Sequence, residues 1–207
     1  MLLRIFLLLS FTLMVMACGS EPESIAREAS VAVKPDASEK ILNEERNKAK
    51  VAIGAFATAL QAELKAAMKT GGPVMAIGVC NTTAMPITET VSLEQGLELS
   101  RVSLKNRNPA NAPEEWQKEV LESFDNRQAA GEDPASLAWS DVAEAEGKQQ
   151  FRFMKAIPTG ALCLQCHGKS ISPDVKAKLA GLYPEDKAIG YSAGDIRGAF
   201  VVTRSLP

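Results

Sequence analysis

One short sequence constrains the fold of this chain more than any other: Cys163-Leu164-Gln165-Cys166-His167, which contains the only histidine among 207 residues. Its two thiols are close enough in sequence to lie on one turn, and the imidazole follows directly. C-x-x-C-H is the attachment sequence of c-type haem, in which each thiol bonds to a vinyl group and the histidine binds the iron. We therefore expect one covalent haem c on Cys163 and Cys166, with His167 as an axial ligand.

Two other interpretations of this C-x-x-C-H motif are less favoured. One is a dithiol that forms a disulfide, but a thioredoxin-like dithiol usually accompanies a βαβ pattern, which this sequence lacks. The other is a zinc site made of Cys80 and the three motif ligands. Structural zinc sites usually combine two paired-ligand motifs, whereas Cys80 stands alone, so the pattern favours haem.

The amino-terminal residues predict export to the periplasm. Residues 1–17 combine one positive charge, Arg4, with an apolar run too short to span a bilayer, which is typical of a signal peptide. Val15-Met16-Ala17-Cys18 resembles a bacterial lipobox, so we expect a lipid anchor on Cys18; the alternative is plain secretion with Cys18 unmodified. Gly19 gives no inner-membrane retention signal, which slightly favours the outer membrane. The expected organisation is a lipoprotein signal peptide (1–17), a flexible tether (18–38) and a haem domain (39–207).

The charge of the chain excludes one class of partner. The formal net charge is -2, and no basic stripe interrupts the sequence. Nucleic-acid binding needs a basic surface that neutralises phosphates. We therefore expect no nucleic-acid partner.

Hydrophobic spacing predicts a long helix followed by antiparallel strands. From Asp36 onward, apolar residues recur at spacings of three and four until Gly71-Gly72-Pro73, which should end the helix. We expect this helix to lie across its own domain, and a homodimer through its alanine-rich face is the alternative. A second helix should begin behind Pro113. Strand patterns occupy residues 96–104, a hairpin over 137–157 and residues 198–206, so the element order predicts an α+β fold.

The sequence around the motif also resembles a known family. The run 101–113 with Trp116, the segment 75–80 and residues 163–168 are similar to bacterial periplasmic c-type haem proteins with a PAS-like (Per-Arnt-Sim) domain, long catalogued as a domain of unknown function. The resemblance covers residues 39–207. It implies a five-stranded antiparallel sheet flanked by helices, one haem, and histidine and cysteine as the two axial ligands.

From the residues alone, the second axial ligand stays open. No second histidine exists, so methionine, cysteine, lysine, tyrosine or an open site remain. Cys80 has no evident disulfide partner, which is unusual in an oxidising compartment, and its alternative role is a small buried hydrophobic residue. The family resemblance implies that Cys80 is the ligand. Core filling is the more typical role for the methionines, Met75, Met85 and Met154.

Basic and aromatic residues are the expected neighbours of the haem. Arg101, Lys105 and Arg107 are candidates to pair with the haem propionates, because arginine binds carboxylates in a forked geometry. The alternative is a solvated basic turn. Four aromatic residues either wall the pocket or belong to the ordinary core: Phe151, Phe153, Tyr183 and Tyr191.

These observations favour a non-enzymatic mono-haem cytochrome that transfers or senses electrons in the periplasm, with a redox partner that the sequence does not identify. An iron with two protein ligands leaves no position for a substrate. The alternative is a gas or redox sensor, or a weak peroxidase-like enzyme, with an open or switchable distal site. The chain offers such an enzyme no distal histidine as an acid-base group.

Overall fold

The computed structural model describes residues 37–207. The expected signal peptide, Cys18 and most of the expected tether lie outside the described residues. The first helix, α1 (Ala37–Gly78), begins at Ala37, so the last residues of the expected tether are helical. The predicted domain boundary at residue 39 stays a prediction.

Helix α1 consists of two arms joined at a kink. Gly71 and Gly72 have non-helical backbone angles, and Gly72 combines φ 65° with ψ -162°, a conformation open in practice only to glycine. Pro73 then begins the second arm, where a missing N–H is tolerated. The first arm therefore ends where the sequence predicts, but the chain returns to helix directly afterwards.

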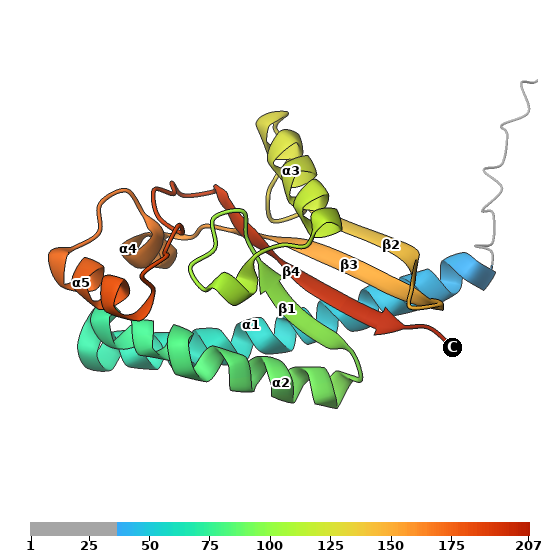
Figure 1. Ribbon diagram of the computed structural model, residues 1–207, viewed down its shortest axis with the longest axis horizontal. Helices are drawn as coiled ribbons and strands as arrows, with labels where there is room; N and C mark the ends of the chain where they lie inside the picture. Colours follow the sequence, from blue (N-terminus) through green and yellow to red (C-terminus); the bar gives the residue numbers. More distant parts are fainter. Residues whose placement is uncertain (1–36) are drawn as a thin grey trace, which may run out of the picture. The chain divides into compact units, whose positions relative to one another are not determined.

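The second arm leads through a π-helical turn, η1 (Val79–Thr83), into α2 (Ala84–Gln95). Gly96, with φ 61°, ends α2 in the left-handed conformation. The returning helix lies beside the first arm of α1 (Figure 1). Cys80 lies within the π-helical turn, near the bend of this helical hairpin.

The sheet contains four antiparallel strands in the order β1-β4-β3-β2 within the described residues. Strands β2 and β3 form the predicted hairpin, with Glu146 (φ 53°) and Gly147 (φ 74°) at its turn. Strand β4 comes last in the sequence but is inserted between β1 and β3. The strands are β1 (Glu98–Val102), β2 (Ala138–Ala145), β3 (Lys148–Pro158) and β4 (Ile196–Ser205).

The α+β class, the antiparallel sheet flanked by helices and the long N-terminal helix are confirmed. The five strands implied by the family resemblance are wrong for residues 37–207, where the sheet has four. The short apolar segment that follows the glycine break does not supply a strand, because it continues as helix.

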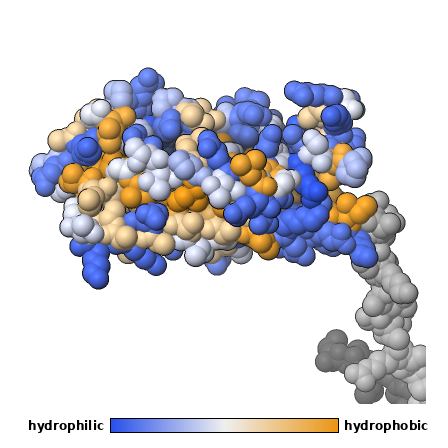
Figure 2. All heavy atoms as spheres, turned by 90° about the horizontal axis from the view of Figure 1, so that it is seen from below, coloured by the Kyte–Doolittle hydropathy of each residue, from blue (hydrophilic) through white to orange (hydrophobic). Residues whose placement is uncertain are grey.

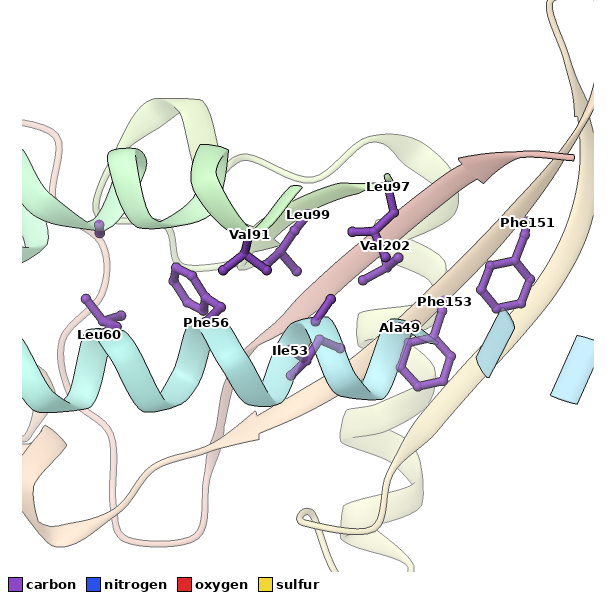
Figure 3. Packing of buried hydrophobic residues seen from close by; sticks show 12 residues of the cluster. Ala49, Ile53, Phe56, Leu60, Val91, Leu97, Leu99, Phe151, Phe153 and Val202 are labelled. Atoms are coloured by element: carbon purple, nitrogen blue, oxygen red, sulfur yellow. The ribbon is translucent and has the colours of Figure 1, made fainter. Parts of the chain in front are cut away.

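Helices cover both faces of the sheet (Figure 1). Helix α1 packs on one face through residues such as Ala49, Ile53 and Phe56, which belong to the same core cluster as Phe153 of β3 (Figure 3). Helix α3 (Glu115–Ala129) packs on the other face through Phe124, against Met154 of the same strand. Phe153 and Met154 are neighbours in sequence, so β3 sends alternate side chains into two separate cores.

The helical hairpin carries several exposed apolar side chains. In Figure 2, which views the domain from below, apolar side chains form a band across the face in view. The homodimer through the N-terminal helix stays a prediction. The exposed large apolar residues of α1 and α2 are Ile41, Val51, Met75, Met85 and Leu93.

Candidate cofactor site

The C-x-x-C-H motif folds as a short helical turn. A 3-10 turn, η3 (Ala161–Cys163), leads into α4 (Leu164–His167). The turn ends at Gly168, whose N–H donates to the Leu164 carbonyl at 3.0 Å. A Cβ at Gly168 would lie 2.5 Å from that oxygen, so only glycine fits directly after the motif. The backbone therefore turns away immediately behind His167.

A loop after α5 (Pro173–Leu182) holds this turn in place. The Tyr191 N–H donates to the His167 carbonyl at 3.0 Å, and the Gly190 N–H donates to the Gly168 carbonyl at 3.1 Å. The Tyr191 ring packs edge-on against the His167 imidazole, with centroids 6.4 Å apart. The loop that carries Gly190 and Tyr191 therefore fixes both the backbone of the motif turn and the orientation of the His167 ring.

One cavity collects the residues that the sequence singled out. Cys163, Cys166 and His167 line it from the motif, and Cys80 lines it from the π-helical turn. The helical hairpin supplies an apolar wall, and the segment after β1 supplies a polar one. The cavity is open to solvent and has a volume of about 180 Å³. Apolar lining residues include Leu60, Leu64, Met68, Ile77, Ile157 and Leu162.

His167 presents a neutral imidazole with a defined tautomer. Its Nδ1 lies 2.8 Å from the Ala188 carbonyl oxygen, which can only accept, so Nδ1 carries the hydrogen. Burial, reinforced by the positive charges of Arg107 and Arg197, lowers the pKa of His167 to about 3. At neutral pH, Nε2 is therefore an unprotonated lone pair, which is the state that a metal ligand requires.

Cys80 is an exposed residue that lines the cavity. Burial raises the pKa of its thiol, while the guanidinium groups of Arg101 and Arg197 act in the opposite direction. Cys80 is thus exposed by surface area, yet its thiol pKa responds to burial. Both hold when its exposed surface faces the cavity, because a thiol inside a hollow is accessible but poorly solvated. A cationic ligand or metal would favour the thiolate here.

Two arginines in the cavity have no anionic partner. Within residues 37–207, neither Arg101 nor Arg197 has a carboxylate at ion-pair distance, and the buried Nε of Arg197 has no hydrogen-bond partner. Burial and the neighbouring charge of Arg197 lower the pKa of Arg101. The Arg101 guanidinium lies 5.0 Å above the Phe56 ring. Two adjacent cations without counter-ions indicate a site for an anionic ligand.

Arg107, in contrast, is fully engaged within the protein. Its Nε lies 3.0 Å from Asp186 Oδ2, and both side chains are nearly buried, at 11% and 12% exposure. Its Nη2 donates to the Cys166 carbonyl and, at 3.2 Å, to the Ala188 carbonyl. Arg107 therefore ties the motif turn to the loop that carries Ala188.

The remaining predicted neighbours divide between the cavity and the core. Lys105 lines the cavity and lies 5.2 Å above the Tyr191 ring. Tyr183 also lines the cavity, whereas Phe151 and Phe153 stack on each other in the core, with centroids 6.5 Å apart. The methionines differ: Met85 lines the cavity, Met75 is exposed and Met154 is fully buried in the α3 core.

Neither competing interpretation of the motif gains support from the geometry. Cys80, Cys163 and Cys166 are free thiols in the described part of the chain. Among residues 37–207, no three His, Cys, Asp or Glu side chains lie close enough together to hold a metal ion by themselves. A four-ligand zinc site is therefore not formed by this arrangement.

Three residues of the site escaped the sequence analysis. Arg197 lines the cavity because β4 begins beside the end of β1, a pairing between segments far apart in sequence. Asp186 and Ala188 act through an ion pair and a backbone carbonyl. No local pattern marks a carbonyl acceptor, since every residue has one.

Fold and site together define an α+β domain whose C-x-x-C-H turn faces a cysteine and two unpaired arginines across one cavity. The family model described as Tll0287-like matches residues 36–205, and the chain belongs to this family. A solved structure, described as the cyanobacterial heme-protein Tll0287, matches with a TM-score of 0.57 and 24% sequence identity, covering 79% of this chain and 96% of that one. This match supports the fold. No curated protein matches the chain.

Proposed function

We propose that this protein is a mono-haem c-type cytochrome that transfers or senses electrons. Its similarity to a cyanobacterial haem protein suggests haem binding, and the geometry supports the finer assignment. The observation that carries it is a cavity lined by both motif thiols, a neutral His167 with a free Nε2, and Cys80. When bound, the haem supplies one-electron chemistry.

The residues present fit such a group. Cys163 and Cys166 would hold it covalently, and His167 would bind the iron through Nε2. Arg101 and Arg197 would pair with the two propionates, since a haem brings the two anions that these partly buried cations lack. Arg107 is a weaker candidate for that role, because its guanidinium already binds a carboxylate and two carbonyls. Lys105, which also lines the cavity, is a further candidate to pair with a propionate.

Cys80 is our candidate for the second axial ligand. It shares the cavity with His167, as does Met85, whereas Met75 and Met154 are not among the cavity-lining residues. As a ligand together with His167, a Cys80 thiolate would donate electron density to the iron and stabilise its ferric state, which would give a low reduction potential. The protein would then serve low-potential electron transfer.

The test uses protein matured in a periplasm with a haem-attachment system. Wild-type protein should keep its Soret band through acid-acetone extraction and gain the mass of one haem, and Cys163→Ala with Cys166→Ala should lose both signals. Cys80→Ala should remove the thiolate features of the ferric spectrum. Met85→Ala, which changes another cavity residue, is the matched control and should leave them intact. A bare polypeptide mass in the wild type would contradict the covalent haem.

A redox-sensing role has one specific observation in its favour. Cys80 lies in a π-helical turn between two α-helical segments, and such turns often occur at functional sites where the backbone can rearrange. If Cys80 binds the haem iron, an added electron would weaken that bond and favour the protonated thiol of Cys80. Reduced wild-type protein should then bind carbon monoxide. Binding that occurs only in Cys80→Ala would exclude this switch.

The compartment forms part of the proposal. Covalent haem attachment on an exported chain agrees with the lipobox-like sequence at Cys18, which lies outside the described residues. We therefore place the protein in the periplasm, attached to a membrane by lipid.

A further inference from the structure

A closed hydrogen-bond network surrounds the carbonyl oxygen that binds His167. Asp186 anchors it with both carboxylate oxygens: Oδ2 binds Arg107 Nε at 3.0 Å, and Oδ1 accepts the Ala188 N–H at 2.8 Å. Arg107 Nη2 in turn donates to the Ala188 carbonyl at 3.2 Å. The same carbonyl accepts Nδ1–H of His167 at 2.8 Å. One backbone oxygen therefore receives both an imidazole and a guanidinium.

This sharing has a chemical consequence for the imidazole. A carbonyl oxygen has two lone pairs, and here each has a donor. The cationic donor draws electron density from the oxygen, so the carbonyl is a weaker acceptor for Nδ1–H than one that binds histidine alone. A weaker bond at Nδ1 makes Nε2 less basic, because the hydrogen bond of a ligating histidine sets its donor strength.

We propose that Arg107 is a positioning residue that acts on His167 through the Ala188 carbonyl, limits electron donation by the imidazole and thereby raises the reduction potential of the site. The inference rests on the proposed haem ligation by His167. Arg107 also donates to the Cys166 carbonyl, and this contact fixes the motif turn relative to the loop that carries Ala188. Asp186 holds the guanidinium and offsets part of its charge.

The geometry also explains why arginine is needed here. The guanidinium reaches a carboxylate and two carbonyls at once because its donors form a rigid planar fork. A lysine ammonium keeps the charge but offers one point of contact. Arg107→Lys therefore separates the contribution of the positive charge from that of the planar arrangement of donors.

The experiment compares haem-bearing wild type with four variants by spectroelectrochemical titration. Arg107→Gln should lower the ferrous-to-ferric ratio at a fixed applied potential about tenfold, equivalent to about 59 mV for one electron. Arg107→Lys should shift the ratio in the same direction. Asp186→Asn should raise it, since an unpaired guanidinium polarises the carbonyl more strongly. Arg204→Gln, a charge loss at the Glu45 ion pair near the other end of β4, should leave the ratio within twofold.

A second measurement follows the imidazole directly. His167 is the only histidine, so ¹⁵N-histidine labelling reports a single ring. The measurement uses the reduced protein in a diamagnetic six-coordinate state, with carbon monoxide added where Cys80 leaves the iron. There, the Nδ1–H proton should move downfield in Arg107→Gln as its bond to the Ala188 carbonyl strengthens. A structural role alone would leave this resonance in place.

The outcomes separate the two proposals. Wild-type potential and resonance in Arg107→Lys, or an unmoved Nδ1–H resonance in Arg107→Gln, would overturn the role of the shared carbonyl. Absence of a pyridine haemochrome in the wild type would instead overturn the haem assignment itself. If Arg107→Gln does not fold, the other two variants still test the proposal. Arg107→Lys should lower the ferrous-to-ferric ratio and Asp186→Asn should raise it, and a shift of both in one direction would overturn the role of Arg107.

Discussion

Replacing Gly198 by alanine should destabilise the domain more than the same replacement at another glycine with positive φ. Gly198, in β4, has φ 152°, and a Cβ there would lie 2.3 Å from the Val102 carbonyl oxygen of β1. A left-handed backbone costs a non-glycine residue about 1–2 kcal/mol. Forcing an extra carbon against backbone adds about 1–3 kcal/mol. The expected total loss is about 2–5 kcal/mol.

Gly194 provides the matched control. It has φ 88°, but a Cβ at this position meets no atom within 4 Å, so Gly194→Ala should carry only the conformational cost. Urea unfolding of the haem-bearing protein measures the difference between the variants. With a slope of about 2 kcal/mol per molar urea, an excess of about 1–3 kcal/mol lowers the midpoint of Gly198→Ala by about 0.5–1.5 M relative to the control.

The result also bears on the site. The Ser103 hydroxyl donates to the Arg197 carbonyl at 2.7 Å, directly before Gly198, so the close approach of β4 to β1 places Arg197 in the cavity next to Arg101. Equal midpoints for Gly198→Ala and Gly194→Ala would refute the reasoning that strand proximity requires a glycine here.

Three further predictions address the anchor, the core and the pH dependence. Cys18→Ser should release the protein from membranes in cell fractionation, and wild-type protein that is soluble without detergent would contradict the lipid anchor. Phe124→Ala should lower the free energy of unfolding by about 3–5 kcal/mol in urea, whereas Leu93→Ala, at an 84% exposed residue, should change it by less than about 0.5 kcal/mol. Burial, with the nearby charge of Asp195, raises the pKa of Asp125, so the folded state binds its proton more tightly and loses stability as pH rises through that window. Asp125→Asn should therefore be more stable than wild type at pH 7 and no more stable at pH values below the ordinary aspartate pKa; equal stabilities at pH 7 would contradict this.

The sequence carried most of the fold because the signals were local. Spacings of three and four residues, the Gly71-Gly72-Pro73 break and the hairpin pattern over residues 137–157 each depend on neighbours in the chain, and the structure contains all of them. The helix after the break was not predicted. Its residues 74–78 form too short a stretch to show helical periodicity, and packing of Ile77 against α5 supports it instead.

The site was predictable only where residue type alone signals chemistry. Cysteine and histidine are rare in this chain, so the motif and Cys80 could be selected before any geometry was known. Arg107 lies beside the motif turn, but its engagement with Asp186 depends on a loop about 80 residues away in sequence, and its predicted contact with a propionate stays a prediction. Arg197 is one of many basic residues, and only strand pairing gives it its position.

The strand order governs how this chain can be assembled. Strand β4 is the only partner of β1 in the described sheet, so β1 joins the hairpin of β2 and β3 only after residues 196–205 have been added. If the chain is exported amino terminus first, as proposed, the turn at residues 163–167 would emerge while the sheet is still in two pieces. Both thiols would then be accessible to an attachment enzyme during this interval. Insertion of the final strand would complete the cavity, whose lining includes Arg197 and Gly198 of β4.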